Sequence, residues 1–241
     1  MINQFSRTEL LFGKEAVEKL SKSRVAVFGI GGVGGYTVEA LVRSGVGEID
    51  IIDNDNVSLT NINRQIYATH ATIGKSKVDV AEARCLEINP NVIINKHKIF
   101  YLPENADQFD FTKYDYIVDA IDTVAGKLAL IENAKKADTP IICSMGAGNK
   151  LNPTAFEVSD IYKTSVCPLA RVIRQECRKR GIERLKCVYS KEPAISPHNE
   201  LNDEKSVKRE IPGSNAFVPS VVGLIIAGEV IKDLTGIKNE N

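Results

Sequence analysis

The sequence predicts an α/β protein built on a doubly wound, mainly parallel sheet, with helices on both faces and a C-terminal extension. Short apolar runs alternate with amphipathic segments through the first 145 residues, which is typical of repeated strand–helix–strand units. A glycine-rich turn, Gly29-Ile-Gly31-Gly-Val-Gly34, joins the first apolar run to the first amphipathic segment. Ligands of such sheets bind beyond the carboxyl ends of the strands, so we expect the functional residues there.

The expected strands and helices follow one another in chain order. Runs rich in Val, Ile and Tyr predict strands, at residues 24–29, 48–53, 92–99, 114–120 and 140–144. Segments with a helical spacing of apolar residues lie between them, at residues 33–44, 75–88 and 124–137. Asn89-Pro90 ends the second of these helices, because proline disfavours helical geometry in the residue before it.

The pattern changes after residue 145. Gly146-Ala-Gly148 interrupts the alternation, a further strand is expected at residues 155–158, and residues 218–234 predict a closing amphipathic helix. Residues 190–213 combine prolines, glycines and many charges, which is typical of a mobile loop. We expect a single domain over residues 1–241, made of an N-terminal helical arm (1–20), a Rossmann-like core (24–145) and an extension (146–241) that contains this loop.

Composition and charge exclude several classes of protein. The chain has 43% apolar and 26% charged residues, which is typical of a globular protein rather than a disordered or membrane protein. Lys and Arg together number 31, as do Asp and Glu, so any surface for nucleic acid has to be local. The N-terminus lacks the apolar segment of a signal peptide, and the longest apolar run, 221–227, is too short to span a bilayer. We expect a cytoplasmic protein without membrane contact.

The five cysteines are expected to be free thiols. They are odd in number, widely spaced and without a C-x-x-C pair, and therefore predict neither structural zinc nor a redox dithiol. Cys143 lies on an expected buried strand and is assigned to the core.

The glycine turn predicts a phosphate-binding site, because the G-x-G-x-x-G pattern stands directly between a strand and a helix. Gly29 permits the tight turn, Gly31 lets backbone N–H groups approach a phosphate, and Gly34 allows the helix to pack closely on the strand. Asp53 ends the second strand, where its carboxylate can bind a ribose diol. These features alone fit NAD as well as ATP.

The residues after the second strand favour ATP. Arg64 lies on the connection, and Lys77 follows Gly74 in the next helical segment. Nucleotidyl transfer develops negative charge on the α-phosphate and the departing pyrophosphate, which Arg and Lys stabilise, whereas hydride transfer needs no such groups. Asp122 follows the fourth strand, where a carboxylate can hold Mg²⁺. Taken singly, these side chains also fit solvated charges or a helix cap, but their convergence at strand ends favours a catalytic site.

Together these motifs resemble the ubiquitin-activating-type superfamily that includes ThiF and MoeB. The resemblance rests on the glycine turn, Asp53, Asn61-x-x-Arg64-Gln65, Gly74-x-x-Lys77 and Asp122. It implies a homodimeric enzyme that adenylates a carboxylate with ATP and Mg²⁺. It also implies residue roles: the ribose for Asp53, the phosphates for Asn61, Arg64 and Lys77, a supporting contact for Gln65, and magnesium for Asp122. Arg7 resembles the arginine that such dimers lend to the ATP of the partner subunit.

Further motifs decide between branches of this superfamily. ThiF and MoeB activate the C-terminal glycine of a ubiquitin-like sulfur carrier and commonly hold zinc through two C-x-x-C pairs, which this chain lacks. The chain instead resembles the tRNA threonylcarbamoyladenosine dehydratase (TcdA) branch in four segments: residues 146–153, residues 160–164, Pro168-Leu-Ala and Cys187-Val-Tyr-Ser190. This second resemblance covers nearly the whole chain.

The branch implies a reaction and a set of partners. ATP adenylates the threonyl carboxylate of the modified tRNA nucleoside and releases pyrophosphate, and the neighbouring carbamoyl group closes a ring as AMP leaves, with net loss of one water. Because the nucleophile is already tethered, no enzyme nucleophile is required. A monovalent cation and the sulfur-acceptor partner of a cysteine desulfurase are further implied. Cys187 matches a cysteine often found in the branch, but nothing nearby in sequence guarantees a reactive thiol, so it receives no catalytic role.

A basic segment is the candidate tRNA surface. Between residues 163 and 191 there are nine Lys or Arg and only two Asp or Glu. Positions 171, 174 and 178 share one helical face, and phosphate contacts of this kind mainly position a nucleic acid. The candidates are Arg171, Arg174, Arg178, Lys179, Arg180 and Arg184. The alternative for each is a solvated side chain.

Three other functions remain open at this point: activation of a sulfur carrier, NAD-dependent oxidoreduction, and nucleotide sensing without turnover. The missing zinc cysteines disfavour the first, and the combination of Arg64, Lys77 and Asp122 disfavours the second.

Overall fold

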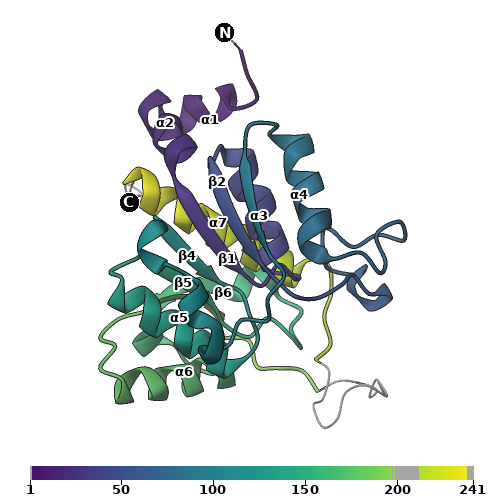
Figure 1. The fold of residues 1–241 in the computed structure, drawn as a ribbon. Helices are drawn as coiled ribbons and strands as arrows, with labels where there is room; N and C mark the ends of the chain where they lie inside the picture. Colours follow the sequence, from purple (N-terminus) through teal and green to yellow (C-terminus); the bar gives the residue numbers. More distant parts are fainter. Residues whose placement is uncertain (1, 197, 199–211, 238–241) are drawn as a thin grey trace.

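One sheet organises the molecule, which is described from a computed structural model covering residues 2–196, 198 and 212–237. Within these residues seven strands lie in the order β3-β2-β1-β4-β5-β7-β6 (Figure 1). Neighbouring strands run parallel, except that β6 is antiparallel to β7. The strands are β1 Arg24–Phe28, β2 Glu48–Ile52, β3 Ile93–His97, β4 Tyr116–Asp119, β5 Ile141–Ser144, β6 Phe156–Asp160 and β7 Lys186–Ser190.

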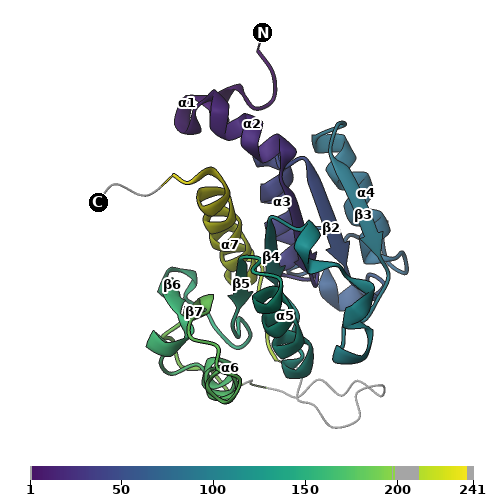
Figure 2. The same cartoon turned by 60° about the vertical axis from the view of Figure 1, so that its left-hand side comes forward.

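Helices cover both faces of this sheet (Figures 1 and 2). Buried side chains of α3, α4 and α7 share one core cluster with the sheet, and those of α5 and α6 pack in clusters with its other side chains. The helices are α1 Ser6–Phe12, α2 Lys14–Lys22, α3 Gly34–Ser44, α4 Lys77–Ile88, α5 Val124–Lys136, α6 Pro168–Lys179 and α7 Val218–Thr235. The predicted doubly wound, mainly parallel architecture is confirmed.

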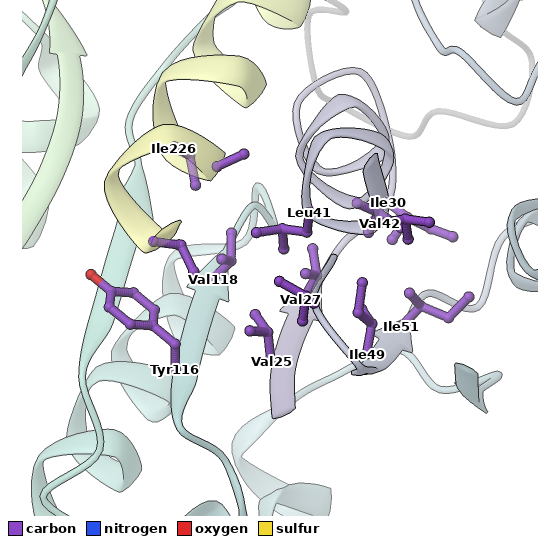
Figure 3. Packing of buried hydrophobic residues seen from close by; sticks show 14 of the residues in the cluster. Val25, Val27, Ile30, Leu41, Val42, Ile49, Ile51, Tyr116, Val118 and Ile226 are labelled. Atoms are coloured by element: carbon purple, nitrogen blue, oxygen red, sulfur yellow. The ribbon is translucent and has the colours of Figure 1, made fainter. Parts of the chain in front are cut away.

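The alternation of side chains along β1 explains why helices are needed on both faces. Val25 and Val27 belong to the cluster with α3 and α7, whereas Ala26 and Phe28 belong to the cluster with α5. Successive residues of a strand point to opposite faces, and all four side chains are completely buried. Figure 3 shows Val25 and Val27 together with Ile226 of α7. Both faces of the strand therefore lose their contact with water.

The strand order reverses at β1. From β1 the chain builds outward through β2 and β3, and it then returns to place β4 on the other side of β1. Loops that follow β1 and β4 diverge at such a point and leave a crevice at the carboxyl ends of the strands. The glycine turn follows β1 and Asp122 follows β4, so the fold places both at this crevice.

The structure differs from the sequence-based expectation in one additional strand and in the start of one helix. Strand β7 was not predicted, because its apolar residues occupy only a few positions of a strongly basic segment. The helix expected at residues 75–88 begins at Lys77. Before it, Val57 N–H donates to the Lys75 carbonyl oxygen and Gly74 N–H donates to the Val57 carbonyl oxygen, both at 2.8 Å. Asn56 and Ser76 form an isolated antiparallel bridge, so these residues are held outside the helix.

The expected arm and loop also need adjustment. The arm at residues 1–20 consists of two helices, of which α1 buries no residue whereas α2 buries Ala16, Val17 and Leu20. Only α1 therefore stands out from the body. The loop expected at residues 190–213 begins later, because Ser190 is a buried residue of β7; residues 197 and 199–211 lie outside the described residues. In the described part of the chain, no helix has both the length and the apolar composition to cross a bilayer.

Candidate functional site

The glycine turn after β1 is packed too tightly for side chains. Gly29 has φ of 81°, and a Cβ atom there would lie 2.8 Å from the carbonyl oxygen of Ala120. A Cβ atom on Gly34 would lie 1.8 Å from the carbonyl oxygen of Gly29. Both glycines are therefore required by the close approach of α3 to the ends of β1 and β4. At Gly31 the nearest atom to an added Cβ is Nε2 of Gln65, at 3.7 Å, so Gly31 faces the more open side of the turn.

Asp53 ties the end of β2 to this turn. One of its carboxylate oxygens accepts a hydrogen bond from the N–H of Ile30 at 3.0 Å, and the other accepts from the N–H of Asp55 at 2.9 Å. Its side chain is only 11% exposed. Asp53 therefore holds the glycine turn in place and keeps lone pairs available for a ligand.

Lys77 is buried between two carboxylates. Its Nζ atom lies 2.7 Å from Oδ2 of Asp55 and 3.6 Å from Oδ1 of Asp53. The Lys77 side chain is 7% exposed, whereas Asp55 is 60% exposed. The ammonium group is thus fixed at the crevice, and Asp55 is the partner that an anionic ligand would have to share or displace. Asp55 was not identified from the sequence, because its importance depends on the start of α4 lying against the segment that follows β2, where the Lys77 N–H donates to the Asp55 carbonyl oxygen at 3.0 Å.

Arg64 lies on the other side of the turn. Its Nη1 atom donates to the carbonyl oxygen of Thr60 at 2.8 Å and to Oδ1 of Asn63 at 2.9 Å. Burial lowers the pKa of the Arg64 guanidinium below its ordinary value, because burial penalises the charged form. The group still carries its charge at neutral pH. It is therefore a partly desolvated cation whose other donors are unpaired among the described residues and suit a phosphate.

Asn61 and Gln65 support this part of the site. Asn61 closes the short 3₁₀ turn Leu59–Asn61, and its Oδ1 atom accepts from the N–H of Ser58 at 3.1 Å. Its own carbonyl oxygen accepts from the Gln65 N–H at 2.9 Å. Both side chains are buried at 9% exposure, so the backbone that carries Arg64 is fixed.

A single cavity of about 520 Å³ brings nearly all of the predicted core residues together. They are Gly29, Gly31, Asp53, Asn61, Arg64, Gln65, Lys77 and Asp122. Gly34 lies beneath the turn and serves the packing described above. The cavity is also bordered by residues that the sequence did not indicate: Ile99, Phe100 and Tyr101 after β3, Ala147 and Gly148 after β5, Pro212 and Ser214, and Pro219 of α7.

Asp122 is an exposed residue that borders this cavity, beside Thr123. Among the described residues, no three His, Cys, Asp or Glu side chains cluster as a metal site. A lone carboxylate fits Mg²⁺ that arrives with a nucleotide, since this ion usually takes one or two carboxylates plus phosphates and water. The Oγ1 atom of Thr123 is buried without a hydrogen-bond partner in the described part of the chain. A Cβ atom on Gly126 would lie 2.8 Å from it, so this atom lies against the start of α5 and not in the open part of the cavity.

Below Asp122 lies a buried ion pair that the sequence did not predict. Lys127 of α5 and Asp119 at the end of β4 are 1% and 0% exposed. Lys127 also donates to the carbonyl oxygen of Ser144 at 2.8 Å. The pair therefore joins the ends of β4 and β5 under the cavity. One feature of the sequence could have indicated this pair: a lysine lies within the apolar pattern of the helix expected at residues 124–137.

Arg7 does not reach the cavity of its own chain. It is exposed on α1, at the opposite edge of the sheet, since Phe5 packs against Gly45 just before β2. Figure 1 shows α1 beyond the amino end of β1. A catalytic role for Arg7 therefore requires a second copy of the chain.

Most of the basic side chains proposed to bind tRNA are engaged within the protein. Arg174 donates to the carbonyl oxygen and hydroxyl of Thr164 at 2.8 and 2.7 Å. The guanidinium of Arg178 lies 5.5 Å from the ring centre of Tyr162. Lys179 pairs with Glu176 at 2.6 Å. These contacts stabilise α6 and its surroundings and lower the charge available to a partner.

The other basic candidates differ from one another. Arg180 pairs with Glu132 at 2.6 Å and also with Glu176, and Arg184 borders a separate cavity near the amino ends of β4 and β5. Arg171 is exposed, in the first turn of α6. Cys167, the N-cap residue of α6, has its sulfur 3.8 Å from an added Cβ on Gly146, which follows β5. Arg171 therefore lies at the sheet edge that carries the cavity.

The cysteines are buried thiols. Burial raises the pKa of Cys187 to about 12 and also raises that of Cys143. A protonated thiol is a poor nucleophile, so neither side chain is suited to react in the folded protein.

Comparison with known proteins adds to this geometry. The ThiF family model matches residues 5–241. The chain is 46% identical to the tRNA threonylcarbamoyladenosine dehydratase of Bacillus subtilis (strain 168), over 97% of this chain and 95% of that protein. It is 35% identical to the protein of the same name from Escherichia coli (strain K12), over 82% of this chain and 76% of that protein.

Solved structures of related proteins are also similar to this chain over nearly its whole length. The E. coli tRNA N6-threonylcarbamoyladenosine dehydratase, TcdA, in complex with ATP is 31% identical, with a TM-score of 0.87 over 97% of this chain and 94% of that chain. The complex with AMP gives a TM-score of 0.88 over the same shares. The structure of E. coli MccB with ATP, at 20% identity and a TM-score of 0.66, shares the fold.

Proposed function

The chain belongs to the ThiF family, and we propose from this that it catalyses the ATP-dependent dehydration of threonylcarbamoyladenosine in tRNA to the cyclic form. Relatives that match almost the full chain bear the name of this activity, in agreement with the motifs found in the sequence. ATP is the cosubstrate, as the related structures with ATP and AMP support. The observation that carries the chemistry is the convergence of Arg64, Lys77 and Asp122 on one cavity beside the glycine turn.

The reaction requires a carboxylate to become a good leaving group. The threonyl carboxylate attacks the α-phosphate of ATP, an acyl–oxygen–phosphorus link forms, and pyrophosphate departs. The carbamoyl group of the same nucleoside then attacks the activated carbonyl carbon, a ring closes, and AMP leaves with the former carboxylate oxygen. The product has lost one water relative to the substrate. Tethering of both reacting groups supplies the proximity that a separate enzyme nucleophile would otherwise provide.

The nucleoside end of ATP is proposed to bind at β2 and β3. Asp53 has a carboxylate at the end of β2 for the ribose, and Tyr101 and Thr123 border the neighbouring space. The N–H groups of the glycine turn then face the phosphates.

The two cations have different proposed tasks. Arg64 is partly desolvated and has donors without partners in the part of the chain that the structure describes, so it is suited to the charge that develops on the phosphates during transfer. Lys77 is already neutralised by Asp55 at 2.7 Å, so it can bind a phosphate only by sharing its donors with that carboxylate. Asn61 and Gln65 keep the backbone between these groups in place.

Mg²⁺ is a proposed companion of ATP, and Asp122 is the residue that would hold it. When bound, such an ion neutralises phosphate charge and orients the departing pyrophosphate. The monovalent cation implied by the resemblance remains a proposal without an assigned residue.

The partners of the enzyme are proposals beyond the tRNA substrate. A homodimer would account for Arg7 and for the apolar surface of α1, where Leu10 and Leu11 are 85% and 81% exposed. The sulfur acceptor of a cysteine desulfurase is a further proposed partner. Cytoplasmic location is likewise proposed, from the tRNA substrate.

Radiolabelled pyrophosphate exchange into ATP tests this function. Exchange should be stimulated by tRNA carrying threonylcarbamoyladenosine and not by the same tRNA lacking the modification. Mass spectrometry of the digested nucleosides should then show a product lighter by one water. Exchange that depends on a ubiquitin-like carrier protein and ignores the modified tRNA would establish the sulfur-carrier alternative instead.

A further inference from the structure

A short segment, residues 212–215, bridges two walls of the cavity. On the first wall, Nδ2 of Asn63 donates to the carbonyl oxygen of Ser214 at 3.0 Å. On the second wall, the N–H of Asn149 donates to the carbonyl oxygen of Gly213 at 2.8 Å. The N–H of Gly213 in turn donates to Oδ1 of Asn149 at 2.6 Å. Pro212 and Ser214, on either side of Gly213, border the cavity.

Asn149 is the residue on which the second wall depends. Its φ of 56° is unusual for a residue other than glycine, and asparagine tolerates this left-handed conformation better than most residues. In this conformation its carbonyl oxygen accepts from the N–H of Ile195 at 2.9 Å, while its N–H and side chain hold Gly213. The side chain and backbone of Asn149 therefore hold together two segments of the extension, one at Ile195 and the other at Gly213.

The bridging segment 212–215 packs closely against the second wall. A Cβ atom on Gly148 would lie 2.8 Å from Cβ of Pro212, so only glycine permits the approach. Nδ2 of Asn215 also donates to the carbonyl oxygen of Lys150 at 2.9 Å. The bridging segment is thus fixed along its length against residues 148–150.

The order of the strands indicates which substrate this wall meets. Along the sheet edge the cavity presents Asp53 after β2, the glycine turn after β1, Asp122 after β4 and Gly148 after β5. With the ribose at Asp53 and the α-phosphate at the glycine turn, ATP occupies the β2 and β1 side. The attacking carboxylate must approach the α-phosphate from the side opposite the pyrophosphate, and the space left for its nucleoside lies toward β4 and β5.

We infer that Asn149 is a positioning residue for the tRNA substrate: through Gly213 it fixes the wall formed by Gly148, Pro212 and Ser214, against which the modified nucleoside binds. This inference rests on the proposed function, since it assigns one wall of the same site to the acceptor. The wall contributes to binding of the modified tRNA and leaves the ATP subsite unchanged.

Two substitutions separate the side chain of Asn149 from its backbone conformation. Asn149→Gly keeps the left-handed conformation accessible and removes the Oδ1 acceptor of Gly213. The KM for modified tRNA should rise by about tenfold, the change expected for one lost hydrogen bond. The kcat at saturating tRNA and the Kd of ATP measured by calorimetry should stay within about twofold of the parent. Asn149→Asp keeps both the conformation and an acceptor oxygen, and should return the KM to within about threefold of the parent.

The control is Asn152→Gly, the same change three positions along the same loop. Within residues 2–196, 198 and 212–237, the side chain of Asn152 accepts only from the N–H and hydroxyl of Thr154, so the KM for tRNA should not change. An unchanged KM in Asn149→Gly, an equal loss of ATP affinity, or a defect that Asn149→Asp fails to correct would overturn the inference. Failure of the proposed function would be distinct, because the parent protein would then show no exchange with modified tRNA.

Discussion

The Nζ atom of Lys127 lies 3.0 Å from each carboxylate oxygen of Asp119, in a pair that is almost completely inaccessible to solvent. The pair closes the space between β4, β5 and α5, and the carbonyl oxygen of Ser144 takes a further hydrogen bond from the ammonium. Asp119 Oδ1 also accepts from the N–H of Ile121 at 3.3 Å. The same carboxylate therefore holds the loop that leads to Asp122.

Removing the lysine should destabilise the protein strongly. Lys127→Met leaves the Asp119 carboxylate buried without its counter-ion, which costs about 3–5 kcal/mol of free energy of unfolding. Urea denaturation measures this loss. The double variant Lys127→Met with Asp119→Asn should recover part of it, because no charge is then left unpaired. A single variant as stable as the parent would show that the pair is solvated in the native protein.

A second buried carboxylate predicts how stability depends on pH. Asp50 is completely buried, and although burial acts to raise its pKa, hydrogen bonds from His97, Arg24 and Asn95 lower it below the ordinary 3.8. Because the folded pKa is the lower one, this stabilisation is present above pH 3.8 and is lost as the pH falls through the folded value. Asp50→Asn should therefore show a flatter decline of unfolding free energy in acid than the parent.

Urea denaturation at a series of acidic pH values measures that decline. Asp107→Asn makes the same chemical change at an exposed position, and its curve should run parallel to that of the parent. If Asp50→Asn also ran parallel, the carboxylate of Asp50 would not contribute to the acid sensitivity.

The sequence predicted the architecture well because local signals agreed with one another. The alternating apolar runs indicated β1 to β5 in order, and the glycines at 29 and 34 occupy positions where the structure leaves no room for a Cβ atom. The predicted cavity residues after β1, β2 and β4 could be found because they follow strand ends. The carboxyl ends of parallel strands necessarily meet at one edge.

Contacts between distant segments could not be read in the same way. Lys127 looked like an ordinary helical lysine, and such residues are almost always exposed; its burial follows only once α5 packs over Asp119. The wall formed by Pro212 and Ser214 depends on hydrogen bonds to Asn63 and Asn149, which are far away in the chain. The basic segment at residues 163–191 indicated positive charge correctly, but the intramolecular pairing of Arg174 required the position of Thr164.

Cys187 should be dispensable for catalysis. Burial raises the pKa of its thiol to about 12, so the nucleophilic thiolate is scarce at neutral pH. Cys187→Ala should keep dehydratase activity within about threefold of the parent. Iodoacetamide should label Cys187 only after denaturation, as peptide mass spectrometry can determine. Labelling of the native protein, or inactivation of a variant that unfolds like the parent, would give the thiol a role.

Salt dependence should distinguish the basic residues of α6. Arg171 is exposed in the first turn of α6, at the sheet edge that carries the cavity, so Arg171→Ala should reduce the slope of log affinity for tRNA against log salt by about one phosphate contact. Arg174→Ala is the matched control on the same helix, because its guanidinium already donates to Thr164 and its loss should leave the slope unchanged. Equal slopes for both variants would place the tRNA elsewhere.

Removing each of the two cations of the cavity should have a different effect on turnover and ATP affinity. Arg64→Ala should lower turnover by about 10²–10³ while ATP still binds, as expected for a group that stabilises charge in the transition state. Lys77→Ala should have a loss of similar size in turnover and should also leave Asp55 and Asp53 without their shared counter-ion. In Lys77→Ala these two carboxylates would then repel the phosphates.

Asp55→Asn added to Lys77→Ala should therefore recover ATP affinity but not turnover, as calorimetry and single-turnover dehydration can measure separately. Full turnover in either single variant would show that the side chain takes no part in the reaction. Recovery of turnover in the double variant would show that Lys77 acts only by neutralising the charge of Asp55.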